Sequence, residues 1–128
     1  MLYNLLSQYL KDVEIAILDL KRAYIEHYSE EILAHNRINL RIRVRFQSGH
    51  LLELNEAVIF ESGHINHLSY RYHLQDQQNN LVFRYDNTPH FPDLDSFPHH
   101  KHLPDKVVSA KKISIMKAIE EANNSCLL

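Results

Sequence analysis

Between residues 38 and 85 the chain repeatedly alternates apolar and polar side chains, and this pattern restricts the fold more than any other feature. The clearest run places polar residues, three of them arginines, between Ile38, Leu40, Ile42, Val44 and Phe46. Because successive side chains of a strand point to opposite faces, this run predicts a strand with one apolar and one basic face. Similar runs over 52–60, 68–74 and 81–85, with a more polar one over 24–32, predict an antiparallel meander of about four or five strands.

Helical patterns flank this meander. Apolar residues recur at intervals of three and four from Leu2 to Leu20, as in an amphipathic helix, although residues 13–18 would equally suit a strand. A second helix is expected between about Ser109 and Ala122, with Ile113, Met116 and Ile119 facing inward. We therefore predict an α+β fold in which the N- and C-terminal helices cover one face of the sheet.

Composition limits the class of protein. The 128 residues, 45% of them hydrophobic, suffice for one domain with a single core, which we place at residues 1–128. A net charge of -2 argues against general adhesion to nucleic acid or membrane. One cysteine, no long apolar run and no secretory signal predict a cytoplasmic protein without membrane contact. The oligomeric state stays open.

Histidines and prolines concentrate at the end of the predicted sheet and just beyond it. All four prolines lie within residues 89–104, which predicts a long irregular Pro/His-rich loop after the last strand. Phe91 and Phe97 favour a loop that packs onto the domain, and long packed loops are often functional. Such a loop is free to fold back over the polar face of the sheet.

Alternation also predicts which polar residues share a face. His73 lies on the same face as Arg71, and Arg84 shares a face with Asp86, whose carboxylate would orient a histidine tautomer. The loop would bring further histidines to them, with His90 and Lys101 as second choices. We predict one catalytic cluster formed by His73, Arg84, Asp86, His99, His100 and His102.

Three interpretations of these histidines stay open. They could act as acid and base in phosphodiester chemistry, where groups that titrate near pH 7 are needed. They could instead hydrogen-bond the backbone of the loop, or hold a divalent metal, since imidazole suits zinc and nickel. No spacing matches an established metal motif, so we favour acid–base chemistry and expect neither metal nor cofactor.

The arginines of the strand over 38–46 repeat at period two and span about 13 Å, the scale of a short nucleic-acid backbone segment. Guanidinium groups suit phosphate, so these side chains are candidates for RNA binding. The alternative is an ordinary charged surface, with Glu53 and Glu56 pairing to the arginines across the sheet. The predicted RNA-binding residues are Arg41, Arg43, Arg45, Arg71 and Lys101.

Three ordered motifs begin at Tyr70 (Tyr-Arg-Tyr-His-Leu-Gln-Asp), Phe83 (Phe-Arg-Tyr-Asp-Asn-Thr-Pro-His) and Phe97 (Phe-Pro-His-His-Lys-His). In these motifs the chain resembles the TumE family, small bacterial and archaeal toxins of two-gene toxin–antitoxin modules. The helix–meander–helix order extends the resemblance over most of the chain. The acidic stretch 26–31 and the arginine run depart from the family's pattern. The family's polar positions fall on Tyr72, His73, Gln75, Asp76, Arg84, Asp86, Asn87, His90, His99, His100, Lys101 and His102.

The resemblance implies a growth inhibitor held inactive by a cognate helix-turn-helix antitoxin protein. An RNA 2′-hydroxyl can attack its own phosphate, so a small protein need only place a base, an acid and a cation. Together these arguments predict a type II toxin that cleaves RNA without a metal. A non-catalytic RNA- or protein-binding toxin and a metal-dependent nuclease remain alternatives. We expect the antitoxin to cover the Arg/His face with an acidic segment.

Overall fold

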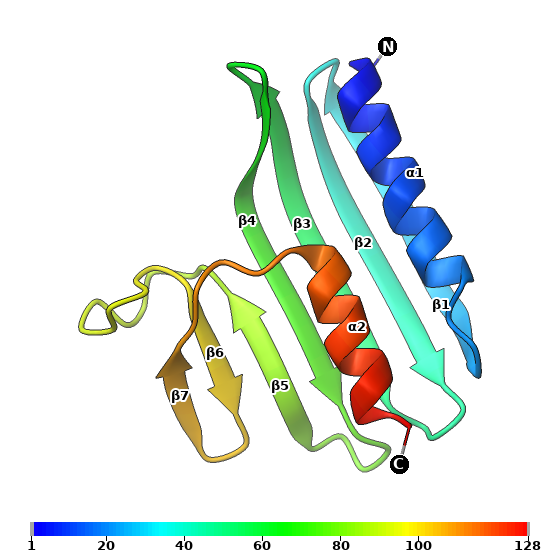
Figure 1. The fold of residues 1–128 in the computed structure, drawn as a ribbon, viewed down its shortest axis with the longest axis vertical. Coiled ribbons are helices and arrows are strands. Elements are labelled where there is room, and N and C mark those ends of the chain that lie inside the picture. Colours follow the sequence, from blue (N-terminus) through cyan, green and yellow to red (C-terminus); the bar gives the residue numbers. More distant parts are fainter. Residues whose placement is uncertain (1, 128) are drawn as a thin grey trace.

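Two helices lie against one face of a seven-stranded antiparallel sheet in the computed structural model, which describes residues 2–127 (Figure 1). Helix α1 (Asn4–Leu18) precedes the strands in the chain, and α2 (Ile115–Ser125) follows them. The strands are ordered in the sheet as they are in the sequence, so each neighbouring pair is connected locally. The α+β fold with flanking helices is confirmed, but the sheet has more strands than the four or five predicted.

The strands are β1 (Ala23–Ala34), β2 (Arg37–Phe46), β3 (Leu51–Glu61), β4 (His64–Gln75), β5 (Leu81–Asp86), β6 (His100–Leu103) and β7 (Lys106–Ser109). The first five correspond to the predicted segments. Strand β6 comes from the stretch predicted to be irregular and β7 from the residues just after it, and neither four-residue strand shows an extended apolar alternation. Pro104 lies in the turn between β6 and β7, a position that proline tolerates. The irregular loop is therefore confined to residues 87–99.

Helix α2 starts later than predicted because β7 uses the residues up to Ser109. The side chain of Ser114 caps the helix by accepting the backbone N–H of Lys117 at 3.2 Å. Ile119 is buried as expected, whereas Met116 is 45% exposed and faces outward. At the other end of the chain, α1 continues to Leu18, so the ambiguous residues 13–18 are helical.

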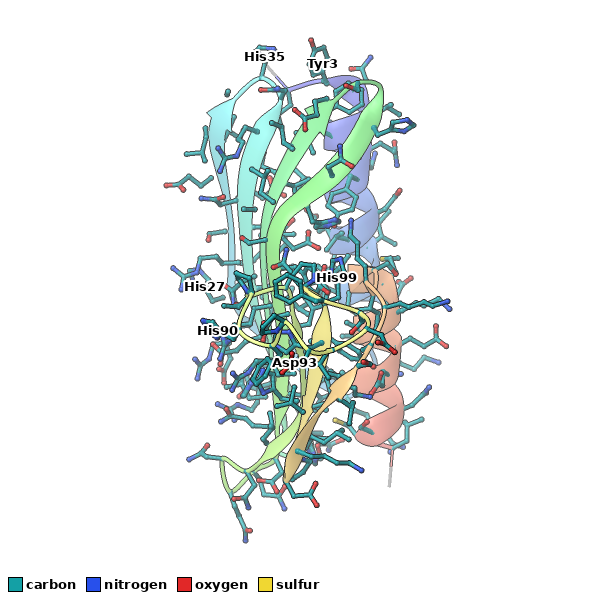
Figure 2. The ribbon with its side chains drawn as sticks, turned by 90° about the vertical axis from the view of Figure 1, so that its left-hand side faces the viewer. Tyr3, His27, His35, His90, Asp93 and His99 are labelled. Atoms are coloured by element: carbon teal, nitrogen blue, oxygen red, sulfur yellow. The ribbon has the colours of Figure 1, made fainter. Side chains whose placement is uncertain are left out.

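The core lies between the helices and the facing side of the sheet. Every second residue of β2, from Ile38 to Phe46, is buried there, as the alternation predicts. The helices add one apolar stripe each, and Figure 2 shows both helices on the same side of the sheet. The buried helix residues are Leu6, Leu10, Val13 and Ile17 of α1 and Ile115, Ala118, Ile119 and Ala122 of α2.

A β-bulge in β4 changes which face the side chains before Tyr70 occupy. Ser69 pairs with Ala57, but the next pair joins His67 to Val58, so Leu68 is the extra residue. One additional residue reverses the alternation. His67 therefore lies on the helix face and Leu68 is 48% exposed, the opposite of the prediction. A regular alternation in the sequence gives no sign of such an insertion.

The displaced His67 joins a buried polar cluster around Glu56, which is only 4% exposed. The hydroxyl of Tyr9 in α1 donates to Glu56 Oε1 at 2.5 Å, and the hydroxyl of Tyr72 donates to Oε2. His67 Nε2 lies 2.9 Å from the same Oε2. Glu56 thus fastens α1 to the centre of the sheet, and the alternative in which it pairs with the arginines is wrong because they lie on the other face.

Replacing Glu56 with alanine should lower the free energy of unfolding by about 3 kcal/mol, because two hydroxyls and an imidazole would be left buried without an acceptor. Urea unfolding followed by circular dichroism measures the change. Glu53→Ala is the matched control, since this carboxylate is partly exposed and lies 3.6 Å from Arg43, and it should cost less than about 1 kcal/mol. Equal losses in the two variants would contradict the structural role of Glu56.

Stability should also fall at alkaline pH. Burial, reinforced by the Glu56 carboxylate, raises the pKa of Tyr9 and Tyr72 far above the ordinary tyrosine value, and burial raises the pKa of Tyr70 to about 12. Phenols with raised pKa in the folded state stabilise it fully below pH 10 and lose that contribution as the pH rises further. We expect the free energy of unfolding to decline from about pH 10, and less steeply in Tyr72→Phe. A flat profile from pH 8 to 11 would be inconsistent with these buried phenols.

Candidate functional site

The face of the sheet away from the helices carries polar side chains in rows that cross the strands. In the first row, the register pairs Arg41 with Asn55, Asn55 with Arg71, Arg71 with Asp86, and Asp86 with His100. Neighbouring strands are about 4.8 Å apart, so each side chain lies beside the next. The row brings together residues from five strands, β2 to β6.

A second row lies two residues along each strand. Its members, by the same pairing, are Arg43, Glu53, His73, Arg84 and His102. Arg84 therefore has an imidazole on either side, His73 on β4 and His102 on β6. A guanidinium flanked by two imidazoles is an arrangement that can hold a phosphate between two proton-transfer groups.

The two rows meet at a triad formed by Asp86, His100 and His102. His100 Nε2 lies 2.9 Å from Asp86 Oδ1, His102 Nε2 lies 3.4 Å from Asp86 Oδ2, and the two Nε2 atoms are 3.1 Å apart. Asp86 and His100 are buried, at 4% and 2% exposure, whereas the side chain of His102 is 22% exposed. Only His102 of the triad is therefore partly open to a ligand.

His73 is held as a neutral ring. Arg84 Nε donates to His73 Nδ1 at 3.3 Å, and His73 Nε2 lies 2.9 Å from Gln75 Oε1, which requires the proton on Nε2. Burial is the largest cause that lowers the pKa of His73, and the charges of Arg71 and Arg84 lower it further. Burial likewise lowers the pKa of His102, although the Asp86 carboxylate acts in the opposite direction.

The irregular loop folds back over the triad. The ring of Phe91 packs edge-on against His100 and His102, with centroid distances of 4.9 and 5.9 Å. At the start of the loop, the backbone N–H of Thr88 donates to Asp86 Oδ1 at 3.0 Å. Figure 2 shows the loop at the edge of the sheet, with His90 on the side away from the helices.

A groove of about 490 Å³ adjoins the triad on the same face. Its lining includes three guanidinium side chains and three amide side chains, those of Arg37, Arg41, Arg71, Asn39, Asn55 and Asn87. The buried Nε of Arg37 has no hydrogen-bond partner among residues 2–127. Arg37 is not among the predicted residues, although it continues the alternation of β2 on the same face as Arg41. The groove is suited to an extended anion.

The comparison with known protein families agrees with the motifs. A family model described as Toxin TumE matches residues 13–124, nearly the whole chain. The chain belongs to the TumE toxin family. No match emerges among curated proteins or solved structures. A toxin family implies an antitoxin partner. No helix within residues 2–127 is long and apolar enough to cross a bilayer.

Two of the residues predicted for the site lie on the helix side of the TumE sheet. His99 Nδ1 is 2.9 Å from the hydroxyl oxygen of Tyr70, on whose ring it stacks, and Figure 2 shows it towards the helices. Lys101 Nζ pairs with Glu121 of α2 at 2.9 Å and lies over the ring of Tyr85. The prediction of a single cluster is wrong for both. Residues 100–103 form strand β6 and not a loop, and alternation along this strand places Lys101 on the opposite face from His100 and His102.

The arginines of β2 also divide into two groups. Arg43 Nε and Arg45 Nε lie 2.9 and 3.0 Å from the carboxylate of Glu26, so both charges are paired. Within residues 2–127, Arg41 and Arg71 form no ion pair, and Arg41 Nε donates to Asn55 at 3.3 Å. Of the predicted RNA-binding residues, these two are therefore the ones with charge available to a ligand.

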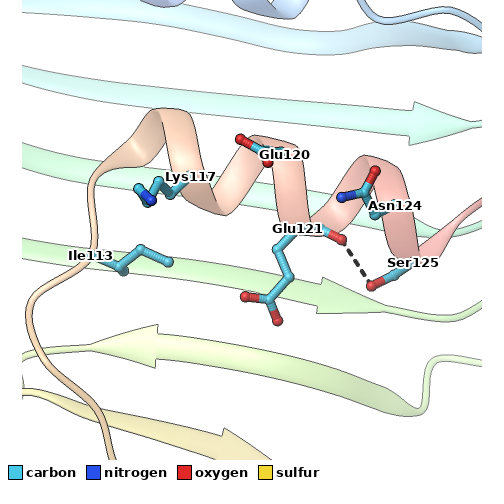
Figure 3. A pocket seen from close by; sticks show the side chains of 6 residues that line it. All are labelled: Ile113, Lys117, Glu120, Glu121, Asn124 and Ser125. Carbon is cyan, nitrogen blue, oxygen red and sulfur yellow. Dashed lines mark hydrogen bonds between the residues drawn. The ribbon is translucent and has the colours of Figure 1, made fainter.

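A further hollow of about 420 Å³ lies along α2, on the other side of the sheet from the triad (Figure 3). It is lined by Ile113, Lys117, Glu120, Glu121, Asn124 and Ser125. The Oγ of Ser125 donates to the backbone oxygen of Glu121, and the Glu121 carboxylate accepts from Tyr85 and Lys101. The lining of this hollow contains neither imidazole nor guanidinium groups, in contrast to the second row on the other face.

Proposed function

We propose that this chain is the toxin of a type II toxin–antitoxin module and inhibits growth by cleaving RNA without a metal ion. The observation that supports this most directly is the second row, in which Arg84 lies between His73 and His102. In-line cleavage of a phosphodiester needs a base and an acid on opposite sides of the phosphorus, with a cation at its oxygens. The proposed cytoplasmic location follows from RNA as the target.

The groove supplies the binding part of this proposal. Arg37, Arg41 and Arg71 would contact successive phosphates, since guanidinium groups form paired hydrogen bonds with phosphate oxygens. The first row from Arg41 to Asp86 crosses three strand spacings, or about 14 Å. RNA would therefore lie across the strands, and its scissile phosphate would reach Arg84 next to the triad.

In the chemical step, one imidazole removes the proton of the 2′-hydroxyl, and the 2′-oxygen attacks the adjacent phosphorus. The bond from phosphorus to the 5′-oxygen breaks, and the other ring, which starts in its protonated imidazolium form, donates a proton to that leaving oxygen. His73 and His102 are the catalytic residues of this scheme, and Arg84 stabilises the charge on the phosphate. Asp86 and His100 are positioning residues, because they contact His102. The nucleophile belongs to the substrate, so the step needs no metal.

The antitoxin would act on the same face. We propose a helix-turn-helix protein that covers the groove with an acidic segment, because opposite charge speeds and orients association. Arg37, Arg41 and Arg71 are the contacts that such a segment would share with RNA. Inhibition would then be direct competition for the groove.

Purified protein should cleave single-stranded RNA in the presence of a chelator and leave 2′,3′-cyclic phosphate ends. His73→Ala and His102→Ala should each reduce the rate by at least about 100-fold, as expected for loss of a general acid or base. The same variants should no longer inhibit growth when expressed. His64→Ala is the matched control, since this exposed histidine begins β4 at the far end from the triad, and it should cleave normally.

Three other outcomes of these assays would contradict metal-free RNA cleavage and favour a different function or mechanism. RNA that is bound but uncut, with growth still inhibited, would favour a non-catalytic binding toxin. Cleavage that disappears with chelator would favour a metal-dependent nuclease. RNA carrying a 2′-deoxynucleotide at the cleavage position should bind and resist cleavage, and its cleavage would also rule out the 2′-hydroxyl mechanism.

The groove predicts that two arginines on the same face of the sheet, Arg71 and Arg43, contribute differently to RNA binding. Arg71→Ala should weaken RNA binding and reduce the salt dependence of the affinity by roughly one phosphate contact. Arg43→Ala should change both quantities less, because Glu26 already neutralises Arg43. Fluorescence anisotropy with labelled, uncleavable RNA over a range of salt concentrations measures both. Equal effects would argue that RNA follows β2 rather than the groove.

A further inference from the structure

We infer that the Asp86–His100–His102 triad binds a divalent transition-metal ion, with Zn²⁺ as the best fit. The three residues each offer one ligand atom, and these atoms lie within 4.8 Å of one another. The candidate ligand atoms are the Nε2 atoms of both histidines and a carboxylate oxygen of Asp86. This site goes beyond the proposed cleavage of RNA, for which no metal is needed.

The first argument is the lone pair that His100 can direct into the triad. His100 Nδ1 lies 2.9 Å from the carbonyl oxygen of Pro98, so it carries a proton and donates it to that oxygen. With the proton on Nδ1, His100 can direct the lone pair of Nε2 to a metal ion, and this atom faces a carboxylate oxygen of Asp86 and the Nε2 of His102. A divalent cation would accept one lone pair from each of the three groups.

The second argument is distance. Zinc binds imidazole nitrogen and carboxylate oxygen at about 2.0–2.2 Å, which places neighbouring ligands of a tetrahedral site about 3.3 Å apart. The two Nε2 atoms are 3.1 Å apart, and they lie 2.9 Å from Oδ1 and 3.4 Å from Oδ2 of Asp86, all close to that value. Two imidazoles and one carboxylate suit zinc and leave the fourth position for water.

The third argument is the support behind the ligands. A metal-bound histidine usually donates its other ring N–H to a backbone carbonyl or a carboxylate, as His100 does to Pro98. The Asp86 carboxylate accepts the N–H of Thr88, and Phe91 covers both imidazoles. The pairing of β5 with β6 places Asp86 opposite His100. Backbone structure therefore preorganises the site.

The effect on activity rests on the proposed function. A metal ion at His102 Nε2 would occupy the lone pair needed for proton transfer to or from RNA. Zn²⁺ should therefore inhibit cleavage, and removing it should restore the activity, so that the site would regulate the toxin. Metal binding itself does not depend on RNA cleavage.

Titration of the untagged, metal-stripped protein with Co²⁺ and Zn²⁺ tests the site. We expect one equivalent of Co²⁺ to give a tetrahedral absorption spectrum, and Zn²⁺ to displace it and raise the melting temperature. His102→Ala and Asp86→Asn should weaken Zn²⁺ binding by at least about 100-fold. His99→Ala and His73→Ala are matched controls and should bind as the native protein does.

Binding that persists unchanged in His102→Ala and Asp86→Asn, or the absence of a Co²⁺ spectrum and of a Zn²⁺-dependent rise in melting temperature, would overturn the inference. Should either variant fail to fold, those two measurements on the native protein decide. RNA cleavage without metal binding would leave the proposed function standing and reject the site. Metal binding that activates cleavage would support the site and reject the metal-free mechanism.

Discussion

The register of β4, β5 and β6 determines both the core and the candidate site. It places Asp86 between Arg71 and His100 on one face, while Phe83 and Tyr85 are buried on the other. A slip of one residue in β5 would exchange these faces, which would expose two aromatic rings and bury charge. Burial of apolar side chains on the helix face therefore fixes the strand register, and this register positions the polar rows on the other face.

Much of this architecture is evident in the sequence because it depends on local periodicity. Alternation identifies the first five strands and the face shared by Arg84 and Asp86, and the three motifs identify the TumE family. Alternation does not predict β6 and β7, because each has only four residues and the pair joins the sheet through the pairing of β6 with β5 across the irregular loop. The bulge at Leu68 is hidden for a similar reason, since it is defined by the partner strand.

The charges show the same division between local and long-range information. Arg41, Arg43 and Arg45 look equivalent in the sequence, yet the bulged pairing of β1 with β2 brings Glu26 to two of them only. Hydrogen bonds from Arg45 and Arg43 lower the pKa of Glu26, which shows that the carboxylate is committed to both. The groove instead collects arginines from β2 and β4, so residue type alone does not reveal which charges are available.

The triad histidines lie on the least anchored part of the sheet. Strands β6 and β7 have four residues each, and only three pairs join β6 to β5. Short edge elements of this kind open at a lower free energy than the central strands. Opening of the hairpin would separate His100 and His102 from Asp86 and leave α1, α2 and β1–β4 folded. The triad and the bulk of the core therefore belong to different cooperative units, so the protein can lose the geometry of the candidate site reversibly without unfolding.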